Sequence, residues 1–177
     1  MVRLTLERMA RALGRVSELG MAISAMAVVV MTLLITVEVV GRNLFRFSTL
    51  IADEMAGYLL VVVTFLGLAG TLRSGGFIRV DTYRSRARGR GRAALDLTIY
   101  GLAAAYMAVL DRYLWHFALD SYRFKSTSIY FTQTPLWIPH SLMALGGSLL
   151  LLEVLAGACL VACGAGGHAE AAASPEL

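Results

Sequence analysis

Charged residues are scarce in this chain: 16% of its 177 residues are Asp, Glu, Lys or Arg, whereas 58% are hydrophobic. A typical soluble domain is about 25% charged. The mean hydropathy of +0.68 is correspondingly high. The composition therefore excludes an ordinary soluble domain, and the length is that of one domain.

Residue patterns that carry out chemistry are also lacking. The sequence has no phosphate-binding glycine loop, no nucleophile arrangement and no cluster of metal-ligating residues. Its two cysteines, Cys159 and Cys163, are four residues apart, which matches neither a redox pair nor a zinc site. We therefore expect no enzyme and no catalytic, cofactor or metal site. No internal repeat is visible, which weakens the case for an inverted-repeat transporter.

What the chain does contain is long apolar runs, which predict an all-α membrane protein with four transmembrane helices. The predicted spans are approximately residues 17–40, 54–73, 93–119 and 136–160. The third span is the least clear: only 97–110 is free of charge, so the helix must continue through Asp111 and Arg112 or begin earlier. We expect residues 1–163 to form a single four-helix domain and 164–177 a disordered tail.

Basic residues predict how the spans are oriented. Of the 16 Lys and Arg residues, four precede the first span and seven run from Arg73, at the end of the second span, to Arg92, against five toward the opposite side. Cytoplasmic loops are enriched in Lys and Arg, so both termini should be cytoplasmic. The net charge of +4 thus comes from Lys and Arg residues that orient the spans in the membrane, and we expect no nucleic-acid binding. Residues 2–16 have the periodicity of a short amphipathic helix on the cytoplasmic leaflet. The first span that follows is predicted to be a retained membrane anchor and not a cleaved signal peptide.

Several charges are predicted to meet at the outer ends of the first two spans. Glu38 and Arg42 have the i, i+4 spacing of a helical ion pair, and Asp53 and Glu54 begin the second span. Two interpretations remain open. The charges could anchor helix ends at the interface, where a helix N-terminus favours acids, or they could contact a partner subunit.

Two rival functions depend on other polar residues. His116 and His140 flank one outer loop and raise the possibility of a haem-bearing membrane anchor of a respiratory enzyme. A small self-sufficient exporter is the other alternative, but it would need an acid at mid-membrane, and the first, second and fourth spans have none. Asp111 and Arg112 point about 100° apart on a helix, so they should not pair with each other.

Four motifs in a fixed order carry a family resemblance. They are Val37-Glu38-Val39-Val40-Gly41-Arg42, then Asp53-Glu54-Met55 with Tyr58-Leu59-Leu60, then Phe65-Leu66-Gly67-Leu68-Ala69, then Leu72-Arg73 through Ile78-Arg79-Val80-Asp81. The segment Thr134-Pro135-Leu136-Trp137-Ile138-Pro139 before the last helix also fits. Over approximately residues 15–160, the chain resembles the small DctQ-like membrane subunit of tripartite ATP-independent periplasmic (TRAP) transporters.

The resemblance implies a multi-pass protein of the bacterial inner membrane that works in a hetero-complex. Its partners would be a large multi-span membrane subunit, which carries the substrate and sodium sites, and a soluble periplasmic binding protein that delivers an organic acid. The small subunit would act as a scaffold, surrounded by membrane lipid, with no cofactor and no contact to nucleic acid. Family members often have histidine where this chain has Phe77.

The resemblance also assigns candidate residues. Glu38, Arg42, Asp53 and Glu54 would form an outer polar cluster, and Arg73, Ile78, Arg79 and Asp81 an inner turn. Among these, Glu54 and Arg73 are the residues that we expect to matter most for assembly. Asp120, Arg123 and Lys125 in the last outer loop are candidate contacts to the binding protein.

Overall fold

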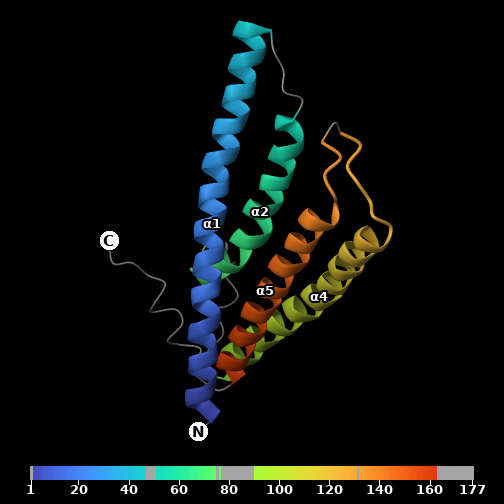
Figure 1. The fold of residues 1–177 in the computed structure, drawn as a ribbon. Coiled ribbons are helices and arrows are strands. Elements are labelled where there is room, and N and C mark those ends of the chain that lie inside the picture. The colour runs from blue at the N-terminus through green and yellow to red at the C-terminus, as the bar shows by residue number, and fades with distance from the viewer. Residues whose placement is uncertain (1, 47–50, 75, 77–89, 131, 163–177) are drawn as a thin grey trace, which may run out of the picture.

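The computed structural model describes residues 2–46, 51–74, 76, 90–130 and 132–162, and it contains four long helices (Figure 1). The helices are α1 (Val2–Phe45), α2 (Ala52–Arg73), α4 (Arg90–Arg123) and α5 (Trp137–Ala162). Each includes a segment long and apolar enough to cross a membrane. Within the described residues the only β-type pairing is an isolated bridge. The predicted all-α fold with four spans is confirmed.

Helix α1 is longer than the predicted first span. The helix predicted over residues 2–16 is present, but it continues without a break into the span, giving one helix of 44 residues and about 66 Å. The physical reason is that Gly14 and Gly20 do not interrupt it: both are buried against α2 and serve close packing instead.

The third span, whose ends were unclear from the sequence, extends beyond the charge-free segment 97–110 at both ends. Helix α4 begins at Arg90, includes Asp96, and continues through Asp111 and Arg112 to Arg123. Its 34 residues give it more than enough length to cross the membrane.

The helices lie in one row in the order α1, α2, α5, α4 (Figure 1). Helix α1 packs chiefly on α2 and also touches α5, α2 packs on α5 as well, and α5 packs on α4. The two inner members of the row, α2 and α5, run in the same direction, and the flanking helices α1 and α4 run the opposite way (Figure 1). A single row buries little of each helix, so most apolar side chains remain exposed for lipid or a partner.

Small residues allow the neighbouring helices of this row to approach closely. Between residues 11 and 30 of α1, the buried positions follow helical spacing and are small: Gly14, Ser17, Gly20, Ser24 and Ala27. A Cβ atom on Gly20 would lie 3.0 Å from the backbone oxygen of Leu66 on α2, and one on Gly146 of α5 only 2.6 Å from that of Phe65. Membrane helices, which gain little from hydrophobic burial against each other, associate through this kind of close packing.

Candidate functional site

Glu54 lies in the first turn of α2 and is the centre of a polar network at the outer end of the row. Its side chain is buried, although it stands near the end of a helix. The Tyr58 hydroxyl, one turn further along α2, donates to Oε1 at 2.6 Å, and the Thr132 hydroxyl donates to Oε2. Because Thr132 belongs to the segment between α4 and α5, the carboxylate of Glu54 ties α2 to that segment.

The segment that supplies Thr132 is folded as a small hairpin. Thr127 and Pro135 form an antiparallel bridge, and the backbone N–H of Ser128 donates to the Thr134 oxygen at 2.9 Å. Gln133 has a positive φ of 47° within its turn. The sequence predicted only a loop here, and the bridge that aims Thr132 at Glu54 was missed.

A cleft of about 460 Å³ opens beside this network, between α2, the hairpin and the first two turns of α5. Both acids that begin α2 line it, together with hydroxyl, aromatic and aliphatic side chains. The lining residues are Asp53, Glu54, Gly57, Tyr58, Val61, Thr127, Ser128, Ile129, Tyr130, Leu136, Pro139, His140 and Met143.

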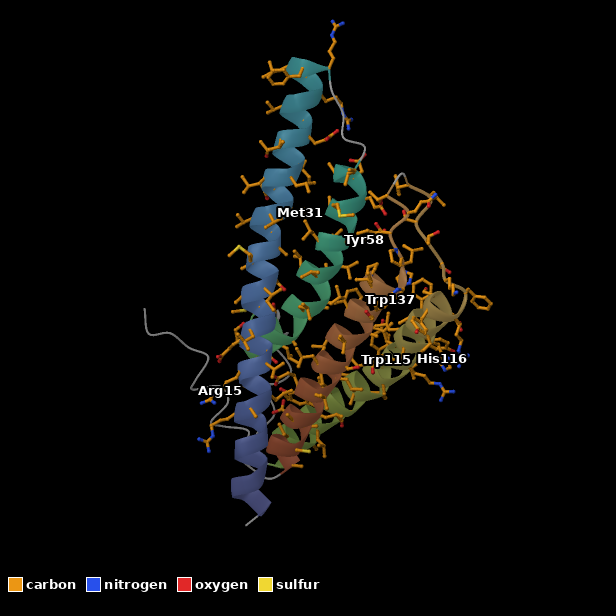
Figure 2. The ribbon with its side chains drawn as sticks, viewed as in Figure 1. Arg15, Met31, Tyr58, Trp115, His116 and Trp137 are labelled. Atoms are coloured by element: carbon orange, nitrogen blue, oxygen red, sulfur yellow. The ribbon has the colours of Figure 1, made fainter. Side chains whose placement is uncertain are left out.

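The two histidines named as a possible haem pair have different surroundings. The Nδ1 atom of His140 lies 2.6 Å from the Ser121 hydroxyl of α4, and its ring packs on Phe117 with centroids 4.0 Å apart. His116 is exposed on α4 (Figure 2). His140 therefore joins α4 to α5 at their outer ends.

The ion pair predicted from spacing at the outer end of α1 is present. Arg42 donates to Glu38 Oε1 at 3.2 Å; the glutamate side chain is buried, and the arginine is exposed. The spacing was sufficient for this prediction because both residues lie on one helix.

The members of the wider outer cluster lie on two helices. The Ser24 hydroxyl of α1 lies 3.3 Å from the Val62 oxygen of α2, which sets the register of the two helices. Counting from that contact at 1.5 Å per residue, Glu38 lies about 9 Å further out than Glu54. The outer polar cluster of Glu38, Arg42, Asp53 and Glu54 therefore stays a prediction. What the structure adds is the contact of Glu54 with the hairpin through Thr132.

A second polar network joins three helices near the inner end of the row. Ser17 of α1 donates to Glu153 Oε1 of α5 at 2.6 Å, and Arg73 of α2 lies 3.6 Å from the same oxygen. Gly14 makes room for the guanidinium, because a Cβ there would be 1.9 Å from Arg73 Cζ. Sequence reasoning missed Glu153. The available signal was an acid at the end of the charge-free run 126–152, since an acid at that depth needs a partner.

A third network joins α4 to α5 at intermediate depth. Ser148 donates to the Asp111 carboxylate at 3.0 Å and accepts from Trp115 Nε1 at 2.9 Å. Gly147 leaves space for the acid, because a Cβ there would lie 3.0 Å from Asp111 Oδ1. Among the described residues, Asp111 bonds with Ser148 and no ion pair joins it to Arg112, as their angular separation predicted.

The remaining candidate residues divide into two groups. Asp120, Arg123 and Lys125 are exposed where α4 ends and the hairpin begins. Phe77, Ile78, Arg79, Asp81 and the predicted tail 164–177 lie outside the described residues. Among the residues whose placement is given, no group of three or more His, Cys, Asp or Glu side chains could hold a metal ion.

Comparison with known proteins gives the family. The family model described as the DctQ component of tripartite ATP-independent periplasmic transporters matches residues 31–164. A curated relative, the ectoine TRAP transporter small permease protein TeaB of Halomonas elongata, is 29% identical over 107 residues, which are 60% of this chain and 55% of that protein. The chain thus spans about half the length of this curated relative. The match to most of the chain, together with four apolar helices, shows that it belongs to the DctQ family of TRAP transporter small permease subunits, multi-pass proteins of the inner membrane.

Proposed function

We propose that this small permease subunit braces a large multi-span subunit during sodium-coupled uptake of an organic acid that a periplasmic binding protein delivers. The main support for the proposal is that polar contacts within the chain connect the helices of the row at three depths. The acids of these contacts, Glu54, Asp111 and Glu153, all have partners within the chain. A chain built in this way offers rigidity and a broad apolar surface for a partner.

The substrate and sodium sites are assigned to the large subunit. In α1, the segment between Glu18 and Glu38 contains no charged residue, and Asp111 is held by Ser148. Membrane transport of a charged solute uses polar groups that face its pathway. The small subunit therefore contributes mechanical support, and the binding protein and large subunit select the organic acid.

Uptake by cells tests this function. In the native bacterium, deletion of this chain with the other subunits retained should reduce uptake of a labelled organic acid to background. Restoring the chain should recover uptake, and replacing external sodium with potassium should abolish it again. Undiminished uptake after deletion would contradict the scaffold role. Uptake or export by this chain expressed alone would favour an autonomous transporter instead.

The assembly role proposed for Glu54 and Arg73 follows from their positions. Each fastens α2 to another part of the row, so Glu54→Ala or Arg73→Ala should distort the surface offered to the large subunit and lower recovery of the complex. Asp120→Ala and Arg123→Ala remove exposed charges elsewhere and serve as matched controls for assembly. Recovery equal to the wild-type level for both α2 variants would contradict this role.

A further inference from the structure

The cleft beside Glu54 opens at the level of the outer headgroup layer. Aromatic side chains are exposed around the outer ends of α4 and α5: Tyr122, Phe124, Tyr130 and Trp137. Tyr122 and Trp137 also contact each other edge to face, with ring centroids 6.0 Å apart. Tyr and Trp concentrate where the bilayer meets water, so these residues mark the depth of the outer headgroups. The hairpin and the mouth of the cleft lie at that depth.

The lining of the cleft changes from acidic to apolar with depth. Asp53 and Glu54 line its mouth, and Val61, eight residues further along α2, lies about 12 Å deeper in the membrane. Met143 of α5 also lines the cleft. Of the lining residues that the structure describes, none is Lys or Arg. The cleft is consequently suited to a molecule with a cationic end and an apolar end.

We propose that this cleft binds a phospholipid whose headgroup carries a primary ammonium group. The ammonium would lie at Asp53 and Glu54, and the start of an acyl chain would lie along Val61 and Met143. The exposed Asp53 carboxylate supplies the contact to the ammonium, while the buried Glu54, bonded to Tyr58 and Thr132, adds negative charge beside it.

The chemistry of the mouth distinguishes among common phospholipids. A primary ammonium has three N–H donors and makes short, charge-assisted hydrogen bonds to carboxylates. A choline headgroup is cationic but has no N–H donor, and a glycerol headgroup leaves the phosphate charge uncompensated beside two acids. Phosphatidylethanolamine is therefore the expected ligand class. The inference goes beyond the proposed function and does not depend on it, since the cleft is formed within this chain.

Lipid titration of the purified full-length chain tests the proposal. Bound phosphatidylethanolamine, phosphatidylcholine and phosphatidylglycerol would be counted by native mass spectrometry in a mild detergent. We expect about tenfold preference for phosphatidylethanolamine, the size of one charge-assisted hydrogen bond. Asp53→Asn should reduce the preference severalfold, whereas Asp120→Asn, an exposed acid outside the cleft, should preserve it. Equal binding of the three lipids would overturn the proposal.

A second pair of variants tests the cleft without changing charge. Gly57 lines the cleft and Gly101 lies on α4, and a Cβ at either position would meet no atom within 4 Å. Gly57→Phe should therefore fold and abolish the lipid preference by filling the cleft, while Gly101→Phe should retain it. Retained preference in a folded Gly57→Phe protein would overturn the assignment. So would Asp53-dependent binding of a soluble polylysine peptide without any lipid preference, which would assign the cleft to a protein partner.

Discussion

Glu54 and Glu153 show how individual residues fasten this membrane protein internally. Each acid is buried on a helix, and each is bonded to a hydroxyl from a distant part of the chain: Thr132 is 78 residues from Glu54, and Ser17 is 136 residues from Glu153. Spacing within one helix predicted the Glu38–Arg42 pair. The two long-range partners could not be predicted, because they depend on which helices become neighbours in the row.

The network around Glu153 should contribute measurably to stability. Glu153→Gln removes the charge opposite Arg73 but keeps an acceptor for Ser17, so the free energy of unfolding in detergent micelles should fall by about 0.5–2 kcal/mol, the range for polar contacts between membrane helices. Glu18→Gln, which neutralises an exposed acid on α1, is the control. Equal stability of the two variants would show that the contact with Arg73 contributes nothing.

The close approach of α5 to α2 should depend on the absence of a side chain at Gly146. A Cβ there would lie 2.6 Å from the Phe65 backbone oxygen, so the helices must separate to admit it. Gly146→Ala should therefore lower the free energy of unfolding by about 1–3 kcal/mol. Gly101→Ala meets open space on a helix and should be neutral or slightly stabilising. Chemical unfolding of both variants in one detergent makes the comparison, and a neutral Gly146→Ala would contradict the described packing.

At the scale of elements, hydropathy was sufficient to identify four helices but not their ends. Residues 2–16 and the first span form one helix, and Gly14 and Gly20, which would weaken an isolated helix, pack against α2. The hairpin before α5 was also beyond prediction. Among its described residues the strand pairing is limited to the bridge between Thr127 and Pro135, which is too short to produce an alternating apolar pattern.

The hairpin should loosen when its connection to α2 is removed. Thr132→Ala deletes the hydroxyl that donates to Glu54, while the backbone bond from Ser128 to Thr134 remains. Hydrogen exchange in the segment 124–136 should accelerate by roughly tenfold, as expected for the loss of about 1–2 kcal/mol of local stability. Ile129→Ala truncates an almost fully exposed side chain of the same hairpin and should leave exchange unchanged. Similar protection in both variants would indicate that Glu54 does not hold the hairpin.

At the scale of the whole molecule, the distribution of Lys and Arg predicts which end of the row of helices faces the cytoplasm. The positive-inside rule places the hairpin outside and the start of α4 inside. In a background with both cysteines replaced, Ile129→Cys should react with a membrane-impermeant maleimide added to intact cells. Gly91→Cys should react only after the membrane is opened. Both positions are exposed, so reversed labelling would reverse the proposed topology.

The apolar surface of the molecule also explains why the sequence could not predict which helix faces contact a partner subunit. Apolar runs reveal spans, but they do not distinguish a surface facing lipid from one facing a partner, because both are apolar. Val37 is 69% exposed on α1, and Leu102 is 69% exposed on α4. These two surfaces lie at opposite edges of the row, and either could meet another subunit.

The most direct test of the scaffold account is the composition of the complex that contains this chain. The chain would be tagged, extracted from its native membrane in mild detergent, and its co-purifying proteins identified and quantified. The account predicts a large multi-span membrane subunit at close to one copy per copy of this chain. Recovery of the chain by itself in several mild detergents, with the large subunit present in the same membranes but absent from the eluate, would contradict it.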